Sequence, residues 1–325
     1  MNTNVKPVID IRNLKVYFYV KAGTVKAVDG VTLALEPGVK LGLVGESGSG
    51  KTTMALALMR MVRPPATIEG ELYLDGVDIL KLSEEEMRRV RLSELAMIPQ
   101  GAMNSLNPVM RIRDQILDGM IDHGMRMSRA EANQKVDELL DIVELPKKVA
   151  RMYPHELSGG MKQRVCVAIA ISMRPKVLIA DEPTSALDVV IQRQVMETIT
   201  RLVKNLNLSM ILIGHDMGLM AQSVDRIAVM YPGKLMEVGE VRDIFADPLH
   251  PYTQALINSL PVLGKRGVFN GIPGVPPSVI NPGPGCPFND RCPKVIEGLC
   301  IQKMPPFREI KPGRWVACHL YEGVN

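Results

Sequence analysis

Long apolar runs are missing from this chain. No stretch approaches the roughly 20 consecutive apolar residues that a membrane-crossing helix needs. The first seven residues, Met1–Pro7, also lack the apolar segment of a secretory signal. The sequence therefore predicts a protein that stays in the cytosol.

Aromatic residues and an excess of one charge are also scarce. Five phenylalanines and one tryptophan stand against 21 methionines, which favours an adaptable core over a methionine-lined groove. The formal net charge is only +4 and is not gathered into basic tracts, so nothing supports sequence-independent nucleic-acid binding. What is present is an ordinary globular composition, with 46% hydrophobic residues among 325, enough for one large domain and an appendage.

The most informative segment that is present is Gly45–Thr52, Gly-Glu-Ser-Gly-Ser-Gly-Lys-Thr, directly after the apolar run Leu41–Val44. Glycines let successive backbone N–H groups turn around an anion, Lys51 supplies a charge for the β and γ phosphates, and the Thr52 hydroxyl can ligate Mg²⁺. Good helix formers in Thr52–Arg60 predict that a helix leaves the loop. The segment therefore predicts a nucleotide phosphate site, with a plain glycine loop as the alternative.

The hydrophobic patterns predict an α/β fold. Alternation in Val8–Phe18 and Val31–Leu35 indicates two antiparallel strands that form a small β layer. Three short apolar runs, Ala96–Ile98, Val177–Ala180 and Met210–Gly214, are typical of fully buried parallel strands. We therefore expect a parallel sheet beside the antiparallel layer.

Helical patterns separate these strands. They cover Ser83–Val90, Arg113–His123 and Ser128–Val143, and the last begins with the capping sequence Ser128–Glu131. A helical insertion therefore lies between the buried strands.

Proline and glycine become dense from about Pro248, which marks a linker into a loop-rich tail. We expect residues 1–260 to form the main domain, with a helical subdomain at about 101–160. Residues 261–325 then form a C-terminal extension.

A second constellation lies at the end of a predicted strand, where Val177–Ala180 is followed by two carboxylates. Asp181 can hold Mg²⁺ through its water shell, and Glu182 can orient and deprotonate the water that attacks a γ-phosphate. An exposed acidic pair without function is the alternative.

The segment Leu157–Arg164 places a serine and two glycines before a helix. Ser158 and the amides of Gly159 and Gly160 could form a second anion-binding helix start. Taken alone, such a turn is more often a helix cap than a ligand site.

These motifs together resemble the ATP-binding subunits of ABC transporters, over about residues 8–240. The elements that match, in family order, are Gly45–Thr52 (Walker A), Gln100 (Q-loop), Leu157–Met161 (signature), Val177–Glu182 (Walker B), Ser185–Asp188 (D-loop) and His215 (switch histidine). The signature departs from the commonest pattern at Met161, where glutamine is usual.

The resemblance implies a P-loop NTPase fold of ABC type: a RecA-like mixed sheet, an antiparallel β layer and a helical subdomain. It also implies a head-to-tail dimer in which each ATP lies between Walker A of one subunit and the signature of the other. Catalytic roles then fall to Glu182, to Gln100, which senses Mg²⁺ and the attacking water, and to His215, which contacts the γ-phosphate. Nucleotide contacts fall to Gly45, Ser47, Gly48, Gly50, Lys51, Thr52, Thr53, Ser158, Gly159, Gly160 and Asp188, and Mg²⁺ contacts to Thr52, Gln100 and Asp181.

The resemblance further implies an aromatic ring that stacks on adenine, and Tyr17, Phe18 and Tyr19 are the candidates. We favour Phe18 by its offset from the strand. All three rings could instead pack against the sheet.

Four of the five cysteines fall near the C-terminus, at Cys286, Cys292, Cys300 and Cys318. In a cytosolic chain disulfides should be reduced, so four close thiols point to a metal or cluster site that holds a loop-rich segment together. Cysteines acting as small hydrophobes are the alternative. Four thiolates fit Zn²⁺ or a [4Fe–4S] cluster, and the missing CxxC pairs together with the Cys-Pro steps favour the cluster.

The segments Asp247–Ile257 and Gly285–Pro293 resemble the C-terminal extension of oligopeptide and dipeptide permease ATPases. This implies a [4Fe–4S] cluster on the four cysteines, with a structural role. The fifth cysteine, Cys166, stands apart in the apolar helix after the signature. His319 is expected either behind the cluster ligands or on the surface.

The resemblance implies an ATPase at the cytoplasmic face of the cell membrane that energises import of di- or oligopeptides. Its partners would be a second ABC ATPase subunit, either a copy of this chain or a related one, two transmembrane permease subunits and, indirectly, an extracytoplasmic solute-binding protein, with no nucleic acid. The segment Ile272–Pro276 resembles the D-type member of a heterodimer. Alternatives are another solute, such as an oligosaccharide or nickel complex, a soluble ABC ATPase acting on nucleic acid, and a redox sensor with a vestigial nucleotide site.

Overall fold

The computed structural model describes residues 6–260 and 271–323. The chain divides into two compact units. Met1–Leu80 and Leu212–Asn325 form the first, here named the phosphate-loop unit, and Lys81–Ile211 form the second, here named the helical unit. The predicted domain boundary near residue 260 adjoins residues 261–270, which lie outside the described residues.

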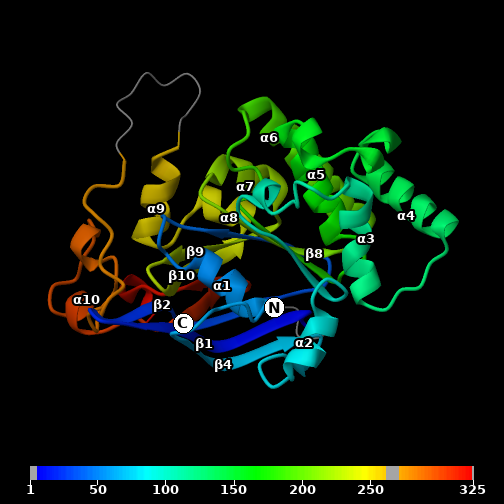
Figure 1. The fold of residues 1–325 in the computed structure, drawn as a ribbon. Helices are drawn as coiled ribbons and strands as arrows, with labels where there is room; N and C mark the ends of the chain where they lie inside the picture. The colour runs from blue at the N-terminus through cyan, green and yellow to red at the C-terminus, as the bar shows by residue number, and fades with distance from the viewer. Residues whose placement is uncertain (1–5, 261–270, 324–325) are drawn as a thin grey trace. The chain divides into compact units, whose positions relative to one another are not determined.

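The phosphate-loop unit begins with an antiparallel sheet (Figure 1). β1 (Ile9–Val20) pairs with β2 (Gly23–Leu35) on one side and β4 (Ala66–Leu74) on the other, and the short β5 (Val77–Asp78) follows β4. Apolar side chains of β1 are buried on one face, beginning with Ile9 at 1% exposure. The prediction of two antiparallel strands with one buried face is confirmed, because period-two alternation places apolar residues on one side of a strand.

Five further strands of this unit form a mixed sheet. Their order is β11 (Arg308–Lys311), β12 (Arg314–Val316), β10 (Lys234–Glu240), β9 (Arg226–Tyr231) and β3 (Lys40–Val44). β3 runs parallel to β9, and the other neighbours are antiparallel. Because β3 is buried from its second residue to its last, it reads as a continuous apolar run rather than an alternation.

The helices of this unit are short. They are α1 (Lys51–Leu58), α7 (Met217–Ser223), α8 (Val241–Ala246), α9 (Pro251–Asn258) and α10 (Leu299–Gln302), with 3₁₀ turns at η4 (Asn289–Arg291) and η5 (His319–Tyr321).

The helical unit contains α2 (Glu84–Val90), α3 (Ile112–Asp122), α4 (Arg129–Ile142), α5 (Gly159–Ala170) and α6 (Val189–Asn205), with 3₁₀ turns η1 (Ala102–Asn104), η2 (Lys147–Arg151) and η3 (Pro154–Glu156). β6 (Leu95–Ile98) pairs in parallel with β7 (Val177–Asp181), and β8 (Ser209–Gly214) spans the boundary of the two units. α3, α4 and α5 contact one another as a helical layer (Figure 1). The predicted capping box is present, since Ser128 and Glu131 cap each other's backbone amides at the start of α4.

The C-terminal residues are built into the phosphate-loop unit. Glu237 of β10, which is 0% exposed, accepts a hydrogen bond of 2.9 Å from Arg314 of β12 and two more from the amides of Leu249 and His250. The buried Glu237 carboxylate is tolerated because these donors compensate for the hydrogen bonds to water that it loses on burial. Phe288 packs its ring 5.3 Å from the rings of both Tyr231 and Tyr252, measured between centroids.

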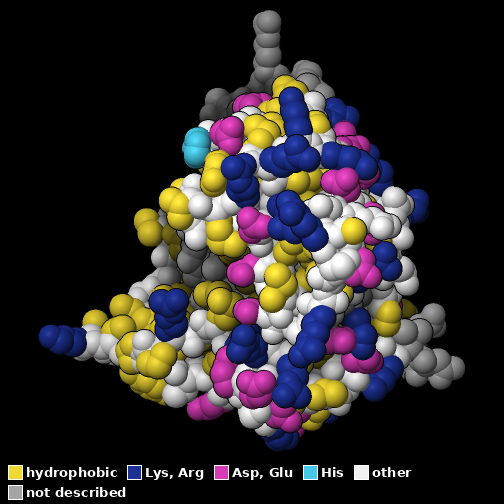
Figure 2. Space-filling view, turned by 45° about the vertical axis from the view of Figure 1, so that its right-hand side comes forward, with side chains coloured by type: hydrophobic (Ala, Val, Ile, Leu, Met, Phe, Trp, Pro, Cys, Tyr) yellow, Lys and Arg dark blue, Asp and Glu magenta, His cyan; other side chains and the backbone are white. Residues whose placement is uncertain are grey.

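Charges of both signs are mixed on one face of the molecule. On the face shown in Figure 2, Lys and Arg side chains lie among Asp and Glu side chains. Across residues 6–260 and 271–323, every helix is too short or too polar to cross a membrane.

Candidate active site

Glycines determine the path of the loop that follows β3. Gly45, Gly48 and Gly50 have φ angles of 152°, 78° and 100°, values that residues with side chains rarely adopt. A Cβ atom on Gly45 would lie 2.1 Å from the carbonyl oxygen of Met230, and one on Gly50 would lie 2.0 Å from that of Ala27. Only glycine fits at these two positions, and α1 begins directly after the loop.

Lys51 lies inside this loop. Its ammonium donates to the carbonyl oxygens of Gly45 and Glu46, both at 2.8 Å, and to the hydroxyl of Ser49 at 3.2 Å. The lysine and the N-terminal amides of α1 make the loop electropositive, so it favours an anion. Ser47, Gly48 and Thr52 are exposed along the loop and first turn, and Thr53 is half-buried.

Glu46 of the loop is held by the C-terminal segment. Arg291 donates to both of its carboxylate oxygens, at 2.8 and 3.0 Å, and the Arg291 side chain is only 6% exposed. The same guanidinium donates to the Tyr231 hydroxyl at 2.9 Å, and the Glu46 amide donates to the Tyr252 hydroxyl at 2.9 Å. The hydrogen bonds with Glu46 raise the pKa of Arg291, which keeps it charged.

Arg291 is not predicted from the sequence, because its partner Glu46 lies 245 residues away and no local pattern connects the two. The one signal was its place directly before a predicted metal-ligating cysteine.

The candidate adenine-stacking aromatics lie on β1. The Tyr17 hydroxyl donates to the Asp29 carboxylate, and Lys26 lies 5.6 Å from the centre of the Tyr17 ring, so this tyrosine is tied to the sheet. Tyr19 is 49% exposed. Phe18 is half-buried and lies on the opposite face of the strand from both tyrosines, because successive side chains of a strand alternate.

His215 directly follows β8 and is exposed within the phosphate-loop unit. The next residue, Asp216, caps α7 by accepting a hydrogen bond of 3.0 Å from the Leu219 amide. The cap fixes the turn on which the histidine is carried.

In the helical unit, β7 ends in the two predicted carboxylates. Asp181 is 0% exposed, and the half-buried Glu182 has a φ angle of 44°. The Gln100 amide, just beyond β6, donates to Glu182 at 2.9 Å. Because β6 and β7 are parallel, their ends meet at one sheet edge, and this hydrogen bond fixes the orientation of the Glu182 carboxylate there.

The signature residues begin α5. Ser158 is the N-cap, with its hydroxyl accepting a 3.4 Å hydrogen bond from the amide three residues on. A Cβ atom on Gly160 would lie 2.6 Å from Ile191 at the start of α6, so the close packing of these helices also requires small residues. Asp188 caps α6, accepting from two amides at 3.0 and 3.1 Å. Ser158, Gly159 and Asp188 are exposed.

The four C-terminal cysteines, Cys286, Cys292, Cys300 and Cys318, line one small cavity. Burial, and to a smaller extent the neighbouring thiols, raises the pKa of Cys286 to about 12 and that of Cys318 to about 11. Among the described residues, however, no group of three or more His, Cys, Asp or Glu side chains is placed to hold a metal ion. The thiols converge, but the ligand arrangement that the predicted metal-cluster extension requires is not seen.

Two other predicted residues are buried. Cys166 donates from its thiol to the Ala102 carbonyl at 3.3 Å, and burial raises its pKa to about 12, which fits core packing. His319 is 5% exposed, with Nε2 2.8 Å from the Lys303 carbonyl oxygen, and it lines the cysteine cavity. The surface alternative for His319 was therefore wrong, because its ring fills space beside the cysteines.

A glycine loop between a buried strand and a helix, and a carboxylate pair at the end of another buried strand, define a phosphate-loop nucleotide-hydrolysing protein. Residues 28–185 match the family described as ABC transporter, and residues 236–300 match the family described as oligopeptide/dipeptide transporter, C-terminal region. The chain belongs to the ABC transporter family, in the branch of oligopeptide and dipeptide transport ATP-binding subunits, and it is an ABC ATPase.

Several curated relatives match almost end to end. The chain is 43% identical over 313 residues to the oligopeptide transport ATP-binding protein OppD of Escherichia coli, covering 95% of this chain and 92% of the relative. It is 41% identical over 318 residues to the dipeptide transport ATP-binding protein DppD of Caldanaerobacter subterraneus, covering 97% of this chain. AppF of Bacillus subtilis, also an oligopeptide transport ATP-binding protein, is 42% identical over 329 residues.

Among solved structures, the dimeric structure of MJ0796, a bacterial ABC transporter cassette, is similar with a TM-score of 0.65 and 27% identity. The match covers 72% of this chain and 99% of that one. A post-hydrolysis dimer of the same cassette, bound to ADP and Pi, matches equally well, with a TM-score of 0.65 and 26% identity. The predicted ABC-type fold with a mixed sheet and helices is confirmed.

Proposed function

We propose that this chain is the ATP-hydrolysing subunit that energises import of di- or oligopeptides through a membrane permease. The observation that carries the proposal is the continuous match to peptide-transport ATP-binding proteins, over both the nucleotide-binding residues and the C-terminal region. Relatives of that branch are named for peptides, which favours peptides over an oligosaccharide, a nickel complex or nucleic acid as the substrate.

In this proposal the phosphate loop binds ATP, with Lys51 on the β and γ phosphates and the Thr52 hydroxyl on Mg²⁺. Asp181 holds Mg²⁺ through water and Glu182 is the general base, oriented by Gln100. His215 contacts the γ-phosphate.

Ser158, Gly159, Gly160 and Asp188 act on the nucleotide of a second ATPase subunit. The exposure of Ser158, Gly159 and Asp188 in the helical unit agrees with a role across a subunit interface. The dimeric state named for the similar cassette supports the same arrangement. Phe18 or Tyr19 stacks on adenine, because Tyr17 is already bonded to the sheet.

We further propose a peripheral position at the cytoplasmic face of the cell membrane, on two transmembrane permease subunits that receive solute from an extracytoplasmic binding protein. The second ATPase subunit is a related chain, with this one in the D-type position. Matches to relatives named OppD, AppD and DppD support that position, although AppF matches at a comparable 42%.

For the C-terminal extension, we propose that Cys286, Cys292, Cys300 and Cys318 hold a [4Fe–4S] cluster, with zinc as the alternative. The fit rests on four thiols around one cavity and on the 2.8 Å hydrogen bond from the Cys286 amide to the Cys300 carbonyl, which joins the two chain segments. A bound cluster would supply a cross-link for this loop-rich segment and no redox step. Iron and acid-labile sulfide in anaerobically purified protein, lost in Cys286→Ser, are expected. Stoichiometric zinc without iron would favour zinc over the cluster. Protein that contains neither iron nor zinc would refute the metal site.

The proposed base is tested with Glu182→Gln, with Glu85→Gln on the exposed side of α2 as the matched control. The Glu182 variant should bind ATP normally, hydrolyse it at least about 100-fold more slowly and accumulate ATP-bound dimers, because proton transfer contributes about 10²–10⁴-fold. Hydrolysis at the wild-type rate would show that Glu182 is not the general base.

The solute is tested separately, by ATP-dependent uptake of labelled tripeptide, oligosaccharide or nickel complex into vesicles that carry the whole transporter.

A further inference from the structure

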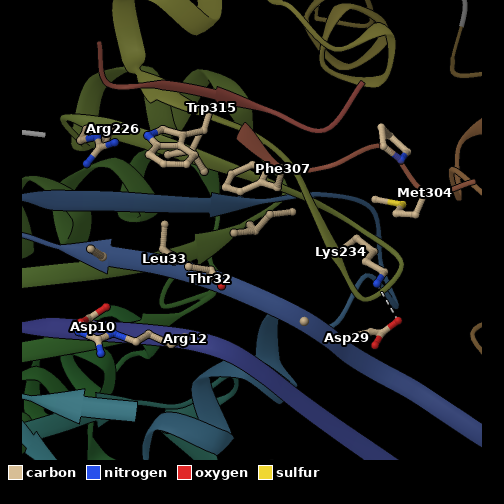
Figure 3. Close-up of a pocket in the computed structure, with 15 residues that line it drawn as sticks. Asp10, Arg12, Asp29, Thr32, Leu33, Arg226, Lys234, Met304, Phe307 and Trp315 are labelled. Atoms are coloured by element: carbon tan, nitrogen blue, oxygen red, sulfur yellow. Dashed lines mark hydrogen bonds and ion pairs between the residues drawn. The ribbon is translucent and has the colours of Figure 1, made fainter. Parts of the chain in front are cut away.

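A cavity of about 660 Å³ lies within the phosphate-loop unit, and neither phosphate-loop residues nor the four C-terminal cysteines line it (Figure 3). One wall comes from β1 and β2, and the other from β9, β10, β12 and the residues just before β11. Its volume falls in the range of about 300–1,000 Å³ that small-molecule sites occupy. None of the nucleotide contacts expected from the sequence lines it.

Much of the lining is apolar. The rings of Phe307 and Trp315 stack, with centroids 5.7 Å apart and planes 26° apart, and together make a broad aromatic surface. Figure 3 shows Leu33 of β2 across the cavity from these rings, and Leu235 of β10 also lines it. Such walls favour a planar or branched apolar body, because each contact removes apolar surface from water.

Two hydrogen-bond donors at this cavity lack strong acceptors. Trp315 Nε1 is buried and has no hydrogen-bond partner among the described residues. Arg226 forms no ion pair with any described residue, and its one side-chain hydrogen bond there is a long one, 3.5 Å to the carbonyl of Gly313, two residues before Trp315. A buried N–H without an acceptor is unfavourable, so a ligand that supplies an acceptor binds more tightly.

The other charged side chains that line the cavity are already paired. Lys234 lies 2.8 Å from Asp29, and Arg12 lies 2.7 Å from Asp10. Three basic residues against two acidic ones leave Arg226 as the unneutralised charge of the lining. The polar end therefore suits one negative charge, and the apolar walls do not suit a free inorganic anion.

We propose that this cavity is a second ligand site, which binds a small organic carboxylate with an apolar or aromatic body. The carboxylate accepts from Trp315 Nε1 and the Arg226 guanidinium, and the apolar body lies between Leu33 and the stacked rings. The inference is independent of the transported solute and of the cluster.

The chain offers its own probe, because Trp315 is its only tryptophan. The probe ligand is 8-anilinonaphthalene-1-sulfonate, an aromatic monoanion that accepts excitation energy from tryptophan. Full-length protein should show saturable one-to-one energy transfer that ATP does not displace. N-acetylphenylalanine should displace the probe, whereas N-acetylphenylalaninamide, which lacks the carboxylate, should be at least about tenfold weaker.

Arg226→Gln should weaken both the probe and N-acetylphenylalanine by about tenfold or more, because a charge-assisted pair is lost. Arg242→Gln, an exposed arginine on α8, is the matched control and should bind as the wild type does. Leu33→Phe, which keeps Arg226 and narrows the space opposite the stacked rings, should weaken the probe by about tenfold or more, and it covers the case in which Arg226→Gln fails to fold.

Equal displacement by acid and amide, unchanged binding in Arg226→Gln, or wild-type affinity for the probe in a folded Leu33→Phe protein would each overturn the proposal. Transfer that rises linearly without saturation would do the same, since it reports an additive on the surface.

Discussion

Replacing Arg291 by alanine should loosen the phosphate loop from a distance of 245 residues along the chain. The arginine holds both oxygens of Glu46 and also donates to the carbonyl oxygens of Ile272 and Pro273. Its loss removes the fork that fixes the loop and leaves a carboxylate without its cation.

The size of the effect follows from burial. The Arg291 side chain is 6% exposed and that of Glu46 is 22% exposed. Removing one partner of a fully buried ion pair costs about 3–5 kcal/mol. Because water reaches part of Glu46, we expect the free energy of unfolding to fall by about 2–4 kcal/mol, and ATP affinity to fall about tenfold if 1.4 kcal/mol of that loss acts on the loop.

Two measurements separate these effects. The thermal unfolding midpoint reports stability, and titration with a fluorescent ATP analogue reports the loop. Arg291→Ala should lower both, Arg291→Lys should recover only part because lysine lacks the bidentate fork, and Arg242→Ala should change neither. If Arg291→Ala lowers the midpoint but binds the ATP analogue with wild-type affinity, the arginine only anchors the extension and does not fix the phosphate loop.

Two further predictions test the loop and its surroundings. Gly50→Ala should abolish ATP binding, because the new Cβ would lie 2.0 Å from the Ala27 carbonyl oxygen at a φ of 100°. The Cβ of Gly48→Ala would have nothing within 4 Å, so this variant should weaken ATP binding only by the about 1–2 kcal/mol that backbone strain costs. Equal losses of affinity for the two variants in calorimetric titrations would contradict this. Burial alone would raise the pKa of Asp29, but hydrogen bonds from Lys234 and Tyr17 outweigh burial and lower the pKa. The Asp29 carboxylate therefore stabilises the fold at pH values above its ordinary pKa, and this contribution is lost as the pH falls through the lowered pKa. The stability difference between wild-type and Asp29→Asn protein, measured by urea unfolding, should therefore close in that acid range, and parallel curves would refute the reasoning.

The elements that sequence reasoning predicted are those whose causes are local. The run Leu41–Val44 with the glycines after it specifies a buried strand, a loop and a helix within a few residues, and the structure has all three. The cap at Ser128 and Glu131 likewise depends on residues three apart. Such signals survive in a single sequence because tertiary contacts reinforce them rather than decide them.

What could not be predicted depends on contacts between distant segments. β11 and β12 are short and carry little periodic signal, and they become strands because β10 offers an edge to β12 and β12 in turn offers one to β11. The pair of Arg291 with Glu46 and the pair of Arg314 with Glu237 join residues 245 and 77 positions apart, so no window of sequence contains both partners.

These long-range contacts tie the C-terminal extension to the rest of the phosphate-loop unit. Arg314 neutralises Glu237, which is 0% exposed, so an unfolded extension would leave a buried carboxylate without its cation. Phe288 packs against the rings of two tyrosines, one of which also accepts a hydrogen bond from the phosphate loop. The extension is therefore part of the core of the phosphate-loop unit, and whatever holds its cysteines together also supports the loop through Arg291.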